Sequence, residues 1–181
     1  MISALVPLKL RFKSKWYQLR YGDAKIEVHS SARVSHKAVI RCSGGGSIRI
    51  GPSCEIHDYS VIDAFGGYVV MGEHCSLNPF AVLYGMGGIT LGNGVRIATQ
   101  TVIVSANHNY KSRDPLRLSG TSGLGVEVGN DVWIGAGARI LDGVSIGSDS
   151  AVGAGAVVNR SVPTGHLAIG VPAESSPIRR E

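Results

Sequence analysis

The chain has 181 residues, of which 44% are apolar and 17% are charged. This composition suits one globular domain and excludes a disordered or fibrous chain. The 25 glycines follow no three-residue period, which excludes a collagen-like helix. Aromatic residues make up only 6%, so a core would consist of aliphatic and small side chains, as in a narrow interior. The net charge of +5 is compatible with nucleic acid, an anionic membrane surface or a polyphosphorylated small molecule as partner.

The first segment along the chain, residues 1–25, is basic and is predicted to be a short helical cap. Its apolar residues lie between its charges, so the cations are expected to form a solvated face. The alternative is weak contact with a membrane surface. The basic residues concentrated here are Lys9, Arg11, Lys13, Lys15 and Arg20.

The rest of the chain carries no stretch long and apolar enough to span a bilayer, and the N-terminus is too polar for a signal sequence. The three cysteines form no CxxC pair, and an odd number leaves one thiol unpaired. A reducing compartment is the simpler interpretation, and we expect a cytoplasmic protein.

Residues 26–162 show a six-residue period of aliphatic side chains. The aliphatic sites are Val28, Val34, Ile40, Ile50, Ile56, Ile62, Met71, Leu77, Leu83, Leu91, Ile97, Ile103, Val128, Ile134, Ile140, Ile146, Val152 and Val158. Two positions before each site stands a small or β-branched residue. A glycine often follows directly, where a tight turn or close packing excludes a side chain. This pattern predicts a coil of short strands in which two residues per hexad point inward.

A single coil cannot bury its inner residues, so only a stack of coils has a core, and both ends need a cap. Every break in the period follows the third hexad of a set, and the longest separates Ile103 from Val128. We therefore predict a triangular prism of about six coils whose insertions all leave at one corner. The predicted excursion spans residues 104–127, and residues 163–181 form a C-terminal tail.

The sequence VEVGNDVWIGAGARILDGVSIGSDSAVGAGAVVNRSVPTGHLAIGVPAE, residues 126–174, resembles the closing signature of the bacterial hexapeptide-repeat acyltransferases, such as the galactoside, maltose and serine O-acetyltransferases. The resemblance implies an all-β fold, the left-handed parallel β-helix. It also implies acetyl-CoA as acyl donor, no metal, and a homotrimer with active sites between neighbouring prisms.

Transfer from a thioester requires a positioned acceptor and a base that takes its proton, and histidine is suited to this near neutral pH. His108, in SANHNY, stands where the coil gives way to the excursion. The family keeps its catalytic histidine there, so His108 is the predicted general base, with a loop histidine as the alternative. Asn78, in SLNPFAV, resembles by its position an asparagine that binds the acceptor or an intermediate in the sugar acetyltransferases. It could equally be a turn asparagine.

For the acyl donor, the resemblance implies a groove along the later coils. Its predicted residues are Trp133, Ala136, Ala154, Asn159 and Arg160. Each has a structural alternative. Trp133 could simply pack on the prism, the two alanines could be ordinary residues of the six-residue repeat, and Arg160 could be an ordinary surface charge. Glu174 departs from the family, because relatives usually carry Lys or Arg after GVPA. An acid cannot pair with a phosphate, so the phosphate end of this site is in question.

Two other classes of function fit the sequence less well. A zinc hydratase with this prism needs three histidines, two of them on one short segment, and the chain has no HxxxxH. For a non-catalytic scaffold, neither a histidine at the start of the excursion nor a long excursion would be expected, and both are present. A cysteine nucleophile is disfavoured because Cys54 and Cys75 occupy the small inward column, while Cys42 alone could be exposed. Nucleic-acid binding has only net charge in its favour.

The acceptor is the least determined partner. The expected substrate is a sugar hydroxyl in polysaccharide biosynthesis, and the alternative is the amine of a nucleotide-linked amino sugar. The excursion is basic through Lys111, Arg113 and Arg117, which would suit an anionic acceptor or a merely soluble loop. Serine is disfavoured, because the long helical N-terminal domain of serine acetyltransferases is missing.

Overall fold

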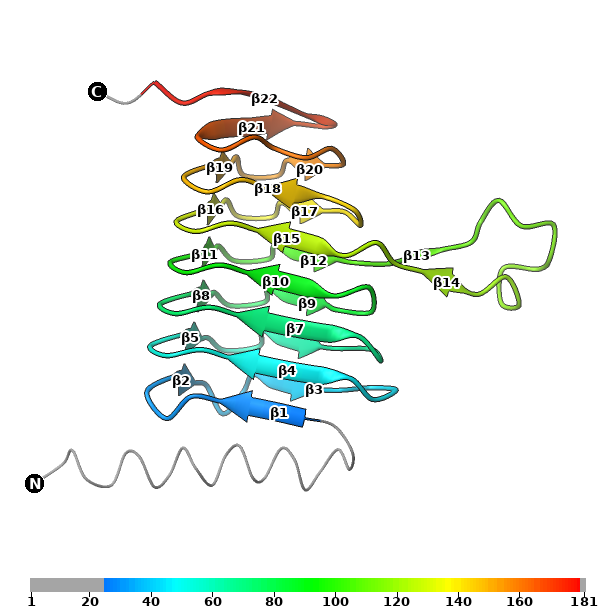
Figure 1. The fold of residues 1–181 in the computed structure, drawn as a ribbon, viewed down its shortest axis with the longest axis horizontal. Helices are drawn as coiled ribbons and strands as arrows, with labels where there is room; N and C mark the ends of the chain where they lie inside the picture. Colours follow the sequence, from blue (N-terminus) through cyan, green and yellow to red (C-terminus); the bar gives the residue numbers. More distant parts are fainter. Residues whose placement is uncertain (1–24, 180–181) are drawn as a thin grey trace, which may run out of the picture.

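The computed structural model describes residues 25–179, which form a parallel β-helix of triangular cross-section (Figure 1). Each coil contributes one short strand to each of three faces. The first face consists of β1 (Lys25–Val28), β4 (Ser47–Ile50), β7 (Tyr68–Met71), β10 (Ile89–Leu91), β15 (Val126–Val128) and β18 (Ser145–Ile146). The third face consists of β3 (Val39–Arg41), β6 (Val61–Asp63), β9 (Val82–Tyr84), β12 (Val102–Val104), β17 (Arg139–Ile140) and β20 (Val157–Val158).

The second face has the same six coils and two further strands. Its strands are β2 (Arg33–Val34), β5 (Glu55–Ile56), β8 (Ser76–Leu77), β11 (Arg96–Ile97), β16 (Trp133–Ile134), β19 (Ala151–Val152), β21 (His166–Gly170) and β22 (Ala173–Pro177). The predicted all-β prism of six coils is confirmed.

The core lies inside the prism and consists of the two inward columns that the period predicts. All eighteen aliphatic sites are at most 9% exposed. The companion column of small residues is buried as well, apart from the partly buried Ala38. Parallel pairing places like residues on top of one another, so that Ile50 of β4 stands beside Met71 of β7. Each coil therefore supplies the cover for the inner residues of its neighbours.

The glycines after the aliphatic sites are required by close packing between coils. A Cβ added to Gly72 would lie 2.7 Å from the carbonyl oxygen of Gly92 in the next coil, which is nearer than real Cβ contacts come. The same holds for Gly51, whose Cβ would lie 2.4 Å from the carbonyl oxygen of Gly72. These glycines let successive corners stack directly.

The insertions leave at the corner between the third and first faces, as predicted. The connections β3–β4, β6–β7, β9–β10 and β12–β15 all cross this corner, and the last of them carries the excursion (Figure 1). The excursion contains a two-stranded antiparallel hairpin of β13 (Asn107–His108) and β14 (Thr121–Ser122). The stack of coils passes this long insertion without a change of register, because β10 still pairs with β15.

The two ends of the prism differ in what the structure describes. The predicted helical cap at residues 1–25 lies outside the described residues except for Lys25, which begins β1, and stays a prediction. At the other end, β21 pairs in parallel with β19, and β22 folds back antiparallel on β21. Ala168 of β21 is 1% exposed, so this hairpin covers the last coil. No helix that could span a bilayer occurs in residues 25–179.

The three cysteines are all free and all buried. Burial of Cys54 and Cys75 in the inward column is confirmed. The expectation that Cys42 could be exposed was wrong, because its side chain turns inward at the insertion corner and is 4% exposed. Burial raises the pKa of the Cys42 thiol to about 11, so it is protonated at neutral pH.

A buried carboxylate holds one of the corner turns. Asp63, at the end of β6, is 0% exposed and accepts hydrogen bonds from Arg41 Nε at 2.5 Å and Ser43 Oγ at 2.8 Å. Its Oδ1 also accepts from the backbone N–H groups of Ser43 at 3.0 Å and Phe65 at 3.1 Å. Burial alone would raise the pKa of Asp63, but these donors outweigh it and hold the pKa below its usual value.

The inward columns predict a large cost for truncation. We expect Leu91→Ala to lower the free energy of unfolding by about 3 kcal/mol, because it opens a cavity in a closed core. Its neighbour Thr90 is exposed on the same strand, so Thr90→Ala should change stability by less than about 0.5 kcal/mol. Urea denaturation at one protein concentration measures both. Equal losses in the two variants would contradict the assignment of the inward column.

Asp63 predicts a pH-dependent contribution to stability. We expect Asp63→Asn to cost about 2 kcal/mol at neutral pH, since a carboxylate that bonds a guanidinium loses its charge. The folded-state pKa lies below the unfolded value of about 3.9, so the contribution is present above about pH 4 and disappears as the pH falls through the folded-state pKa. Urea denaturation across this range should show the two proteins converging. The exposed Glu127→Gln serves as control, and a constant difference down to acid unfolding would contradict the prediction.

Candidate active site

His108 lies where the excursion leaves the prism. It follows β12 after a short connection and pairs with Thr121 across the β13–β14 hairpin. Its side chain is exposed. The prediction that this histidine marks the point of departure of the excursion is confirmed, whereas its role as general base stays a prediction.

The base of the excursion is fastened to the next coil by one carboxylate. Asp142 Oδ1 accepts hydrogen bonds from the backbone N–H groups of Leu124 at 2.8 Å and Gly125 at 3.0 Å. Asn107 Nδ2 donates to Asp142 Oδ2 at 3.3 Å. Both ends of the excursion are thus tied to the coil that follows, so His108 has a defined place although it is exposed.

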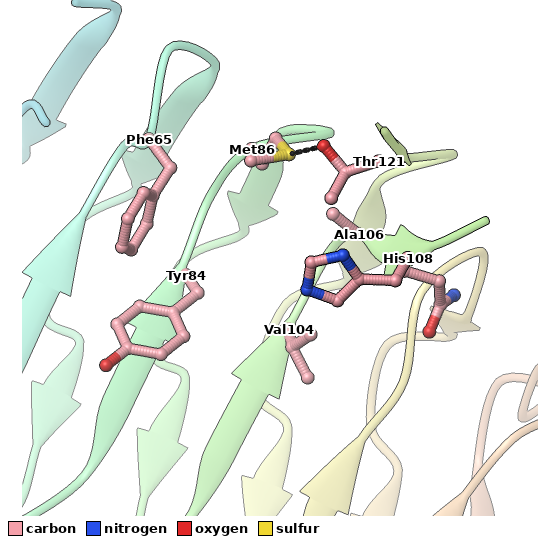
Figure 2. A pocket seen from close by; sticks show the side chains of 8 residues that line it. Phe65, Tyr84, Met86, Val104, Ala106, His108 and Thr121 are labelled. Atoms are coloured by element: carbon pink, nitrogen blue, oxygen red, sulfur yellow. Dashed lines mark hydrogen bonds between the residues drawn. The ribbon is translucent and has the colours of Figure 1, made fainter. Parts of the chain in front are cut away.

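A hollow of about 260 Å³ opens beside His108 (Figure 2). Its lining comes from two successive corner turns and the base of the excursion. The lining residues are Phe65, Tyr84, Met86, Val104, Ala106, Asn107, His108 and Thr121. In Figure 2 the imidazole of His108 is directed toward the side where Tyr84 and Met86 lie. An acceptor in this hollow would have the imidazole within reach.

The sequence analysis missed Phe65, Tyr84 and Met86 as members of this site. They lie in the short insertions after the second and third coils, which the period identifies only as breaks. A signal for them existed, since all insertions leave at the corner that carries His108. Stacking those insertions would have placed these three residues beneath it.

Asn78 lies at a different corner, between the second and third faces. Its Nδ2 donates to the carbonyl oxygen of Ile97 in the next coil at 2.9 Å, which supports the structural alternative. It does not line the hollow beside His108 within one chain. A role for Asn78 toward the acceptor of a neighbouring subunit stays a prediction.

The predicted donor residues all lie in coils beyond His108. Ala136 and Ala154 occupy the corner between the second and third faces, where the N–H of Gly155 donates to the carbonyl oxygen of Ala136 at 2.8 Å. Asn159 and Arg160 are exposed at the corner between the third and first faces. These residues therefore flank the upper part of the third face. Their contacts with a donor stay predictions.

Trp133 lies apart from that pair of corners, on the outer side of β16 in the second face. It is 53% exposed and shares a shallow groove with Arg96, His74 and Asp131. Both a donor contact and packing stay open for this side chain. Glu174 lies on β22 opposite Ile169 and is exposed.

Residues 25–179 bring no three His, Cys, Asp or Glu side chains together in an arrangement that could hold a metal ion. The only histidine that lines the hollow is His108. The imidazole of His108 can accept and donate a proton.

Comparison with known proteins adds two sequence relatives that match about half of the chain. A Schizosaccharomyces pombe protein, whose name assigns it provisionally to the acetyltransferases, is 36% identical over 95 residues, which are 51% of this chain and 43% of that protein. Nodulation protein L of Rhizobium meliloti is 47% identical over 87 residues, which are 47% of this chain and 46% of that protein. The matched segments span less than half the length of either relative.

Solved structures show the same architecture. AntD, an N-acyltransferase from Bacillus cereus in complex with dTDP-4-amino-4,6-dideoxyglucose and coenzyme A, superposes with a TM-score of 0.74 over 91% of this chain and 89% of its own, at 24% identity. PerB from Caulobacter crescentus, in complex with CoA and GDP-perosamine, gives a TM-score of 0.55 over 92% of this chain and 66% of its own, at 26% identity. The match to left-handed β-helix acyltransferases confirms the predicted fold.

The family comparison falls on the later coils. Residues 125–160 match the sequence family described as bacterial transferase hexapeptide, six repeats. This segment overlaps the motif of residues 126–174 on which the predicted resemblance was based. The matched repeats and the shared left-handed β-helix together confirm that the chain resembles the bacterial hexapeptide-repeat acyltransferases, and residues 125–160 carry the repeat of that family.

Proposed function

We propose that this protein is an acyltransferase that moves an acetyl group from acetyl-CoA to a hydroxyl of a sugar or glycan precursor. The observation that carries the proposal is the exposed imidazole of His108 at the edge of a hollow, on a prism of the acyltransferase type. The sequence relative whose name assigns it provisionally to the acetyltransferases supports acetyl transfer.

In the proposed reaction, an imidazole nitrogen of His108 takes the proton of the acceptor hydroxyl while its oxygen attacks the thioester carbonyl carbon. The new C–O bond forms, and the carbonyl oxygen carries the developing charge. Collapse of this intermediate breaks the C–S bond, and the CoA sulfur takes the proton from the imidazolium. The products are the acetyl ester and free CoA, so the thiol reports each turnover.

The second candidate is transfer to an amine of a nucleotide-linked amino sugar. It is favoured by the ligands of the two structural neighbours, dTDP-4-amino-4,6-dideoxyglucose in AntD and GDP-perosamine in PerB. The same base would take a proton from the attacking amine. A screen of sugar glycosides and nucleotide-linked amino sugars, measured by thiol release, separates the two candidates by which acceptor is used.

His108→Ala tests the proposal most directly. We expect loss of general-base catalysis to lower kcat by at least about 100-fold, without loss of the fold. His36 is also exposed but lies at a low corner of the prism, so His36→Ala should keep full activity. Thiol release measures activity, and urea denaturation verifies folding. Full activity of folded His108→Ala would refute the role of His108.

We further propose a homotrimer in which the third face packs against neighbouring prisms. Four valines form a continuous outward column there, with Val39, Val61, Val82 and Val102 in register on successive strands. An apolar column of this length suits a buried contact better than solvent. Light scattering should give three times the chain mass for the wild type and a lower mass for Val82→Asp. A wild-type monomer would contradict the proposal.

A further inference from the structure

The hollow beside His108 has one distinctly apolar side. We call Phe65, Tyr84 and Met86 the apolar wall. They come from two successive turns at the corner between the third and first faces, and Val104 of β12 continues the surface toward His108 (Figure 2). The phenol oxygen of Tyr84 is at the end of the ring remote from His108, so the part of the wall nearest the imidazole is hydrocarbon.

The apolar wall is held in place before any ligand arrives. The rings of Phe65 and Tyr84 meet edge to face, with centroids 5.1 Å apart and an interplanar angle of 90°. Thr121 Oγ1 donates to Met86 Sδ at 3.1 Å, which joins the wall to the strand opposite His108. A preset surface binds a ligand with a smaller loss of conformational entropy.

Phe65 keeps its place at an energetic cost. Its φ is 45°, in the left-handed region that bulky residues rarely adopt. The buried carboxylate of Asp63 holds this turn by accepting from the N–H of Phe65. The turn fixed in this way presents the Phe65 ring to the hollow.

The order of residues along the corner separates two sides of His108. The apolar wall follows the second and third coils, and His108 follows the fourth. Asn159 and Arg160, two of the predicted donor residues, follow the sixth. An acyl donor bound along the later coils would thus approach His108 from one side. The apolar wall, on the other side, would remain available to the acceptor.

The described lining of the hollow contains no lysine, arginine or carboxylate side chain. The hollow's volume of about 260 Å³ is below the range of about 300–1,000 Å³ that is usual for drug-sized ligands. These properties fit one neutral sugar ring better than an oligosaccharide or an anionic group.

From these observations we propose that the apolar wall seats the acceptor's sugar ring, and that it prefers a 6-deoxy ring to the corresponding 6-hydroxy ring. A hydroxymethyl group against Phe65 and Met86 would leave its hydroxyl without a partner, whereas a methyl group would bury apolar surface. This inference rests on the proposed acyl transfer for the identity of the ligand as acceptor. It goes further by naming the class of sugar.

Binding without turnover tests the inference apart from the proposed activity. Saturation-transfer NMR titrations of the full chain would use two matched pairs of probes. These are methyl β-D-fucopyranoside against methyl β-D-galactopyranoside, and methyl 6-deoxy-β-D-glucopyranoside against methyl β-D-glucopyranoside. We expect about tenfold tighter binding of the 6-deoxy member of at least one pair, the modest discrimination typical of an apolar site against a hydroxyl.

The variants locate the preference. Tyr84→Ala and Phe65→Ala should abolish it. Tyr68 is a matched control, since it is 44% exposed on β7 against 38% for Tyr84 and does not line the hollow, so Tyr68→Ala should keep it. No binding of any probe, equal affinities within both pairs, or a preference that persists in both wall variants would overturn the inference.

Kinetics distinguish failure of this inference from failure of the proposed function. With any acceptor that supports thiol release, Tyr84→Ala should raise its KM about tenfold and leave the KM for acetyl-CoA unchanged. Active wild-type protein with an unchanged acceptor KM in Tyr84→Ala would overturn the role of the wall alone. Absence of thiol release with every acceptor would refute the acyl transfer, while the binding titration still decides whether the wall selects sugars.

Discussion

The structure depends on one packing constraint, which is that the two inward residues of each hexad are covered only by the coils above and below. Ile97 is fully buried because β8 and β16 lie on either side of β11. A short strand with two inward residues has no stability alone, so the coils form together or not at all. Close stacking also explains the glycines, since a side chain at Gly72 would push two coils apart.

That constraint favours the corner of the insertions as the place for the catalytic group. The faces are committed to ladder hydrogen bonds and the interior to packing, so functional groups gather where the chain can depart from the period. Two of the turns at this corner and the excursion contribute side chains to one surface that no single turn could provide. Asp63 and Asp142 serve this corner in the same way, because each places a carboxylate where several N–H groups of an irregular segment converge.

The sequence predicts the periodic part of this protein well and the irregular part poorly. The six-residue period identifies directly which residues point inward. Counting three hexads per coil also predicts that all insertions leave at one corner. His108 could be found because it is a single histidine at the longest break, where the family resemblance also implies a catalytic histidine. Phe65, Tyr84 and Met86 could not, since their meeting depends on turn geometry rather than on period. Cys42 was misjudged for the same reason, because it sits within an insertion and yet turns inward. The left-handedness of the β-helix was predicted from the family resemblance, because a six-residue period does not distinguish a left-handed coil from a right-handed one.

The Asp142 contact has a consequence for how such proteins can diversify. The base of the excursion is anchored to the following coil through Asp142. Beyond it, the Asn109 side chain donates a hydrogen bond to the carbonyl oxygen of Ser119 and so closes the loop between these two residues. The length of that loop therefore does not affect the geometry of the stack. Residues could be added to or removed from its tip without shifting His108 or any coil. Evolution, or an engineer, could therefore exchange this loop as a cassette and change what reaches the histidine while the prism stays the same.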